Sequence, residues 1–216
     1  KTHFISNALP NETVEFQYLT NKSQFAEGIA TNIIKNPSQI RENPKCPVFN
    51  LCGGCSLQHI KSNEQAKFKQ SLVQEMLEHH NATPENILEP ITDNPWGYRH
   101  KARLGVKYVY KKGGTLVGFR EINTGYIVDM QSCPVLAPEI GENISTLREF
   151  ISDLDAKDSI PQIEVAITKT QTALIFRHLE PLSESDLNKL NNLSNNKNWK
   201  IYLQSKGPDS IKLLTS

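Results

Sequence analysis

The spacing of four cysteines constrains the fold of this chain more than any other sequence feature. Cys46, Cys52 and Cys55 lie within ten residues of each other, whereas Cys133 lies far downstream. Two glycines between the second and third cysteines let the backbone turn tightly, as a chelating loop requires. If all four thiols serve one centre, the fold must bring two distant segments together.

Three kinds of cysteine chemistry compete. Disulfides need an oxidising compartment, and the chain shows no signal peptide. A redox pair at Cys52-Gly-Gly-Cys55 would leave Cys46 and Cys133 unexplained and lacks a strand-to-helix setting. Metal binding accounts for all four. The spacing alone leaves zinc and a [4Fe–4S] cluster open, because zinc sites usually come as paired C-x2-C halves and clusters often use a triad with a remote cysteine.

Positive charge is concentrated in one stretch. Residues 95–120 hold seven basic and no acidic residues, which leaves 17 basic and 23 acidic residues elsewhere. Residues 101–109 alternate apolar and basic side chains, as a half-buried strand does, so the cations share one face. Lys111-Lys-Gly-Gly114 predicts a hairpin turn into a second strand, Thr115–Arg120. This face suits RNA phosphates; its predicted contacts are Arg99, Lys101, Arg103, Lys107 and Arg120.

The rest of the chain predicts alternating hairpins and helices. Strands are expected at 13–18, 25–34, 163–168, 173–177 and 199–203, the last being the final strand. A capping box at Ser62 and Gln65 predicts a helix whose apolar side carries Phe68, Leu72, Val73 and Met76. Apolar residues from Ile140 to Leu154 predict a second helix, and Ser183 caps a third. This order indicates an α+β fold with a mainly antiparallel sheet.

Composition indicates a globular protein, with 38% hydrophobic and 22% charged residues. No apolar run approaches the roughly 18 residues of a membrane span. We therefore expect no membrane partner and a cytoplasmic location; no protein partner is evident. No phosphate-binding glycine loop is present. Gln58 and His59 directly follow the cysteine loop and are further predicted RNA contacts, although local hydrogen bonding is equally plausible.

Four motifs, in this order, resemble the RumA-type 23S ribosomal RNA uracil-5-methyltransferases, relatives of TrmA. They are Cys46-Pro-x4-Cys-Gly-Gly-Cys-x2-Gln-His59, Trp96-Gly-Tyr-Arg-x-Lys-Ala-Arg103, Val117-Gly-Phe-Arg120 and Ile127-Val-Asp-x3-Cys-Pro-Val-Leu136. The resemblance implies that Cys46, Cys52, Cys55 and Cys133 hold a [4Fe–4S] cluster. It also implies three regions: the end of a TRAM (OB-like) RNA-binding β-barrel at 1–40, a cluster loop at 41–60 and a central α+β RNA-binding domain at 61–216.

The chain departs from this family in lacking the S-adenosylmethionine-binding domain with its nucleophilic cysteine. It begins at Lys1 rather than Met and stops at Leu214-Thr215-Ser216, so we expect part of a longer enzyme. Methylation of uracil C5 needs a thiolate to add at C6, and no cysteine is spare if all four bind the cluster. The expected function is the RNA-recognition and iron–sulfur portion of a 23S rRNA methyltransferase, inactive alone. The alternative is an independent iron–sulfur or zinc protein whose basic face binds another anionic or redox partner.

Overall fold

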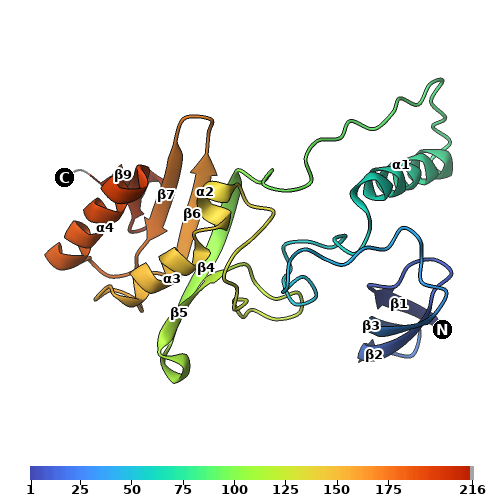
Figure 1. The fold of residues 1–216 in the computed structure, drawn as a ribbon, viewed down its shortest axis with the longest axis horizontal. Coiled ribbons are helices and arrows are strands. Elements are labelled where there is room, and N and C mark those ends of the chain that lie inside the picture. The colour runs from blue at the N-terminus through green and yellow to red at the C-terminus, as the bar shows by residue number, and fades with distance from the viewer. Residues whose placement is uncertain (215–216) are drawn as a thin grey trace. The chain divides into compact units, whose positions relative to one another are not determined.

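The computed structural model describes residues 1–214, which divide into two compact units (Figure 1). The N-terminal unit comprises Lys1–Pro44 and Leu57–Thr92, and the central unit comprises Lys45–Ser56 and Asp93–Ser216. These units differ from the regions expected at 1–40, 41–60 and 61–216. The cysteine loop groups with the central unit, whereas the helix that follows it groups with the N-terminal strands.

The N-terminal unit contains a three-stranded sheet in the order β1-β3-β2. Its strands are β1 (Thr2–Ser6), β2 (Thr13–Asn21) and β3 (Phe25–Lys35). β2 and β3 form the expected antiparallel pair, and their register shifts in three places. β1 was not predicted from the sequence. It pairs in parallel with β3, and its residues are mostly exposed, so the strand lacks the alternation that reveals a half-buried strand.

The same unit contains α1 (Ser62–His79), which starts where the sequence predicts a helix. The predicted capping box is wrong. Lys61 occupies the N-cap position, and the Gln65 side chain donates a hydrogen bond to the carbonyl oxygen of Ile60 at 2.8 Å. None of the residues in α1 is buried.

The central unit is built on a six-stranded sheet in the order β5-β4-β6-β7-β8-β9. Only the β7–β8 pair is parallel, so the predicted mainly antiparallel sheet is confirmed. Its strands are β4 (Lys101–Val109), β5 (Gly114–Gly118), β6 (Gln162–Ile167), β7 (Thr172–Arg177), β8 (Trp199–Gln204) and β9 (Ile211–Leu213). The second strand of the first hairpin is shorter than predicted and stops before Arg120. β9 was missed because its three residues are exposed.

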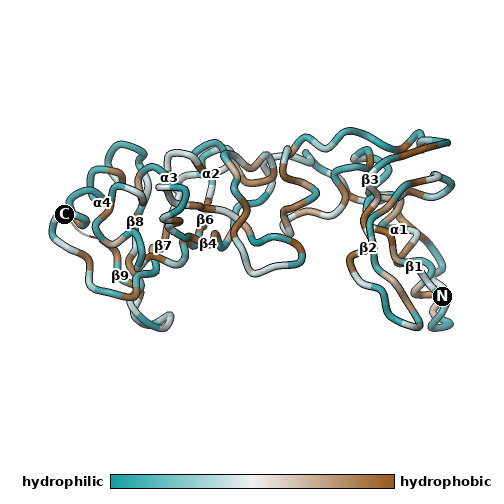
Figure 2. The backbone as a smooth tube through the Cα atoms, turned by 90° about the horizontal axis from the view of Figure 1, so that it is seen from below, coloured by the Kyte–Doolittle hydropathy of each residue, from teal (hydrophilic) through white to brown (hydrophobic). Residues whose placement is uncertain are grey.

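Helices cover one face of this sheet. They are α2 (Pro138–Gly141), α3 (Ile144–Ser152) and α4 (Glu184–Lys197); short 3₁₀ turns follow β4 (η1, Tyr110–Lys112) and precede β9 (η2, Pro208–Ser210). The single helix predicted from Ile140 onward is thus two helices. Leu147 of α3 and Leu190 of α4 pack in one cluster with Leu104, Ile163 and Phe176 of the strands. The apolar segments of β4 and β6 are brown in Figure 2.

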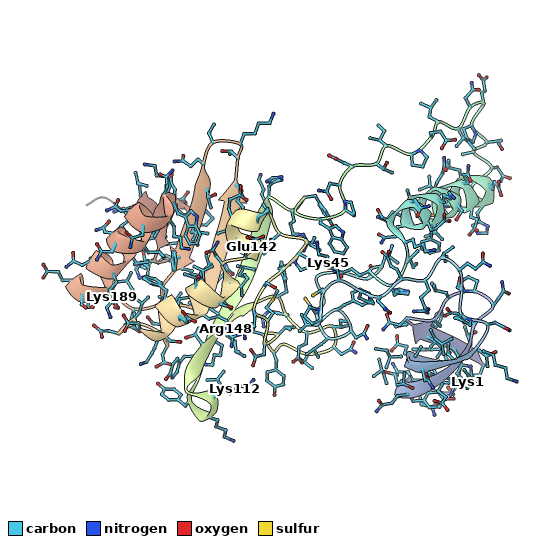
Figure 3. All side chains as sticks on the ribbon, viewed as in Figure 1. Lys1, Lys45, Lys112, Glu142, Arg148 and Lys189 are labelled. Atoms are coloured by element: carbon cyan, nitrogen blue, oxygen red, sulfur yellow. The ribbon has the colours of Figure 1, made fainter. Side chains whose placement is uncertain are left out.

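Polar contacts anchor the helices to the sheet and to neighbouring loops. Arg148 of α3, labelled in Figure 3, donates to the carbonyl oxygens of Thr115 and Met130, each at 2.9 Å. At the start of α4, the Ser183 hydroxyl accepts the Asp186 N–H, so this predicted cap is confirmed. The fully buried Asp186 carboxylate accepts the N–H groups of Asp155 and Ala156.

No helix within residues 1–214 combines the length and the apolar character that crossing a bilayer requires.

Candidate functional site

The cysteine loop folds back on itself and packs on the segment after β5. Cys52 N donates to the Val48 carbonyl oxygen at 2.8 Å, which closes the first turn. Gly53 N donates to the Arg120 carbonyl oxygen at 2.9 Å, and Ile122 N donates to that of Leu51 at 3.0 Å. The loop is therefore joined to the segment after β5 by backbone hydrogen bonds and has a defined position within the central unit.

Gly54 lies where a larger residue would be crowded. A Cβ atom there would lie 3.3 Å from the Phe119 ring and 3.4 Å from the Cys52 sulfur. The Gly54 N–H points at the Cys52 sulfur at 3.4 Å. Its carbonyl oxygen accepts a hydrogen bond from Arg99 at 3.1 Å, and the Arg99 guanidinium lies 5.4 Å from the centre of the Phe119 ring. Arg99 thus anchors the loop through its side chain.

The fourth cysteine is fixed by the turn before α2. Cys133 is buried, and its N–H donates to the Gly141 carbonyl oxygen at 2.8 Å. A Cβ atom at position 141 would lie 2.4 Å from the Cys133 carbonyl oxygen, so only glycine permits this close approach. The end of α2 therefore sets the position of Cys133.

The four cysteines are close enough to influence one another electrostatically. Burial raises the pKa of both the Cys46 and Cys52 thiols. The charges of Cys133 and Cys55 raise both pKa values further. None of these four described residues forms a disulfide. A bound cation would reverse the effect and favour thiolates. Within residues 1–214, no three His, Cys, Asp or Glu side chains are grouped as a single metal ion would require.

The face of the six-stranded sheet opposite the helices carries most of the predicted cations. Lys101, Arg103 and Lys107 are exposed, whereas Leu104 and Val106 are buried, so the predicted alternation in β4 is confirmed. A Cβ atom at Gly105 would lie 3.0 Å from the Ile127 side chain, which therefore crosses the face there and separates Lys107 from the other two cations.

Strand register adds two cations that the sequence pattern did not reveal. Lys101 pairs with Ala166, Ala166 with Ala173, and Ala173 with Lys200, so two small side chains lie between two lysines. Arg177 lies on the same face, four residues from Ala173 along β7, and is exposed. The sequence predicts both β7 and β8, but only the pairing of the strands shows that Arg177 and Lys200 share a face with the cations of β4.

Arg103 and Arg120 have partners within the protein. Arg103 forms an ion pair with Glu164 at 2.9 Å, directly across the strands, and its side chain is 70% exposed. Arg120 lies in the loop after β5, where its side chain donates to the Gly125 carbonyl oxygen. Their predicted contacts with RNA stay predictions.

Gln58 and His59 belong to the N-terminal unit, and both are buried. Burial lowers the pKa of His59, and the positive charge of Arg41 lowers it further. Their predicted role in RNA binding also stays a prediction.

Comparison with known proteins relates the chain to one class of RNA-modifying enzymes. No protein-family model matches it. The 23S rRNA (uracil(1939)-C(5))-methyltransferase RlmD of Legionella pneumophila (strain Lens) is 45% identical over 213 residues, 98% of this chain and 48% of that protein. The RlmD protein of Francisella tularensis subsp. novicida is 46% identical over 214 residues, 98% of this chain and 47% of that protein.

A solved structure supports the fold. The tRNA (uracil-54, C5)-methyltransferase of Pyrococcus abyssi, in complex with S-adenosyl-L-homocysteine, superposes with a TM-score of 0.64 at 21% identity. The match covers 98% of this chain and 50% of that one. Along nearly its whole length, the chain is thus homologous to the 23S rRNA (uracil-C5)-methyltransferases named RlmD, and it spans about half of their length.

Proposed function

We propose that this chain is the RNA-recognition and iron–sulfur portion of an S-adenosylmethionine-dependent enzyme that methylates uracil C5 in 23S rRNA. The observation that carries the proposal is the identity of about 45% with RlmD proteins along 98% of the chain. Under this proposal, methyl transfer belongs to the half of the relatives that residues 1–216 do not span. A ribosomal substrate implies a cytoplasmic location.

The donor set supports a [4Fe–4S] cluster on Cys46, Cys52, Cys55 and Cys133. None of these cysteines forms a disulfide, and Cys55 and Cys133 both act electrostatically on the Cys46 and Cys52 thiols, whose pKa values burial raises, so the four side chains lie near one another. A cluster takes one thiolate on each of four iron atoms. When bound, it would cross-link the cysteine loop to the turn before α2. With all four thiols used as ligands, none is left in the chain to attack uracil C6.

The sheet face opposite the helices supports RNA binding. Its exposed cations are Lys101, Arg103, Lys107, Arg177 and Lys200. The acidic residue Glu164 lies across from Arg103 and forms an ion pair with it. Phosphate contacts of this kind position the substrate but do not select its sequence. We also propose that the N-terminal sheet belongs to a TRAM-like barrel, because its three register shifts bend β2 and β3 as barrel closure needs.

The cluster is tested by anaerobic purification of residues 1–216 and of the Cys133→Ser variant. Wild-type protein should contain iron and sulfide and absorb broadly near roughly 400 nm. The variant should lose most of this absorption. Stoichiometric zinc without iron in the wild-type protein would refute the cluster.

RNA binding is tested by the salt dependence of affinity for 23S rRNA segments. Lys101→Ala and Lys200→Ala should each flatten the log–log slope by roughly 0.7 to 0.9. Lys189→Ala is the matched control, since Lys189, which is labelled in Figure 3, lies on α4 and pairs with Asp153. If the slopes of all three variants equal the wild-type slope, this face does not contact RNA.

Methyl transfer is tested with labelled S-adenosylmethionine. Purified residues 1–216 should add no methyl group to 23S rRNA, because every thiol is assigned to the cluster. Labelled 5-methyluracil in the product would contradict that assignment.

A further inference from the structure

A row of apolar side chains crosses the sheet face opposite the helices, among the cations described above. Tyr202 of β8 pairs with Ile175 of β7 on one side and with Leu213 of β9 on the other. Paired residues of neighbouring strands point their side chains to the same face. Leu213 is 46% exposed, and Tyr202 and Ile175 are partly exposed. This Tyr202 row therefore presents an aromatic ring between two aliphatic side chains.

Alternation along β8 places the Tyr202 ring away from the core. Trp199 and Ile201 are buried in the main cluster, and Leu203 packs against it. Within residues 1–214, Tyr202 neither belongs to that cluster nor packs against it, and its hydroxyl has no hydrogen-bond partner. The fold thus does not use this ring as it uses the other apolar residues of the strand.

Cations lie on both sides of the Tyr202 row. Lys200 precedes Tyr202 by two residues along β8, which places their Cα atoms roughly 6.6 Å apart in an extended strand. On the other side, Arg177 pairs with Gln204, two residues after Tyr202. Both cations are exposed, and within residues 1–214 neither forms an ion pair. Their charges are therefore available to a ligand that also reaches the ring.

An aromatic ring between two cations suits a nucleotide with an unpaired base. Unpaired RNA bases stack on aromatic side chains, and other RNA-binding sheets present such rings on their surface. A duplex keeps its base faces inside its own stack, so it offers phosphates to the cations but no base to the ring. An apolar protein partner fits this face poorly, because charged residues bound the row on both sides.

We propose that Tyr202, supported by Ile175 and Leu213, is a stacking platform for one unpaired base of the RNA, and that Lys200 and Arg177 hold the phosphates on either side of it. The inference rests on the proposed function, because it takes RNA as the partner of this face. It adds a preference for unpaired nucleotides. Phosphate contacts alone carry no information about the bases.

The proposal is tested by the affinity of residues 1–216 for a single-stranded 23S rRNA segment and for the same segment annealed to its complement. Tyr202→Leu keeps an apolar side chain but removes the ring, so it should weaken single-strand binding by at least roughly fivefold. Duplex affinity should stay unchanged. The salt slope should also equal that of the wild type, because no phosphate contact is lost. Tyr202→Phe is the matched control and should bind both RNAs like the wild type.

Photochemical crosslinking reports the contact directly. Each uridine of the single-stranded segment is replaced in turn by 5-iodouridine, and the irradiated complex is digested and mapped. At least one position should crosslink to the peptide that contains Tyr202. Tyr202→Phe should keep this crosslink, and Tyr202→Leu should lose it.

Three results would overturn the proposal. Unchanged single-strand affinity in Tyr202→Leu would show that no base stacks on the ring. Equal losses for single strand and duplex would mean that the ring supports the sheet, and crosslinks found only outside β8 would place the unpaired bases elsewhere. The proposed function is judged separately: if Lys101→Ala flattens the salt slope while Tyr202→Leu has no effect, RNA binding stands and stacking fails. If the wild-type protein binds neither RNA, both fail.

Discussion

Helices α1 and α4 have similar amphipathic patterns but opposite environments. α4 buries Leu190 and Leu193 against the six-stranded sheet, whereas α1 buries nothing. The difference extends to their units: among the described residues, the buried apolar side chains of the N-terminal unit are Leu9, Ala26 and Ile60, while the central unit contains the large core cluster. Apolar spacing therefore predicts a helix, but it does not predict which surface covers it.

Polar contacts partly replace a core in the N-terminal unit. The Glu12 carboxylate accepts the N–H groups of Leu9 and Ser38 at 2.9 Å and forms an ion pair with Arg41 at 2.5 Å. These bonds join the turn at residues 9–12 to the segment at residues 38–41. The central unit is held by apolar burial and the N-terminal unit by this network, which leads to different expected responses to mutation.

The largest contrast is expected between two phenylalanines. Phe176 is fully buried in β7, so Phe176→Ala should lower the free energy of unfolding of the central unit by about 3–5 kcal/mol. Phe68→Ala on α1 should change the stability of residues 1–216 by less than about 1 kcal/mol. Urea unfolding measures both. Similar losses would mean that α1 is packed in solution.

The network around Glu12 should give the N-terminal unit a pH dependence. Hydrogen bonding by Arg41 lowers the pKa of Glu12 from 4.5 to about 2. Because the folded pKa is depressed, its stabilisation should be full above pH about 4.5 and lost as pH falls toward about 2. Glu12→Gln should cost about 2 kcal/mol at pH 7 and little at pH 2, because it leaves buried donors poorly paired. Thermal unfolding of both proteins at several pH values, followed by a signal from the N-terminal unit, checks this. A stability difference between wild type and Glu12→Gln that stays the same at every pH would contradict it.

Two sequence-predicted caps should differ in strength. Ser183→Ala should destabilise the central unit by about 1 kcal/mol, because its hydroxyl accepts the Asp186 N–H. Ser62→Ala should have almost no effect, since no side-chain cap forms at α1. Chemical denaturation of the two variants tests the comparison. A comparable loss at Ser62 would show that the capping box forms after all.

The smallest stability change is expected at the sheet surface. Arg103→Ala should alter the free energy of unfolding by less than about 1 kcal/mol, because the Arg103–Glu164 pair is exposed. Glu164→Gln should behave alike and provides the matched control. A loss of several kcal/mol in either variant, measured by urea unfolding, would mean that this pair is structural.

Sequence patterns predicted an element best where residues close together along the chain determine its secondary structure. Alternation located β4, β6 and β7, and a serine three residues before Asp186 located the start of α4. The patterns failed for β1 and β9, whose exposed residues carry no alternation signal. They also joined α2 and α3 into one helix, because the apolar residues of the two share a continuous spacing.

The sequence by itself determined the spacing of the four cysteines, the alternating charges of β4 and the homology to RlmD proteins. Only the tertiary structure decided that Arg99 anchors the cysteine loop, that Lys200 shares a face with Lys101, and that no residue of α1 is buried. The physical reason is that periodicity describes one element at a time. Which faces meet depends on strand register and on contacts between residues far apart in the chain, such as that between Gly53 and Arg120.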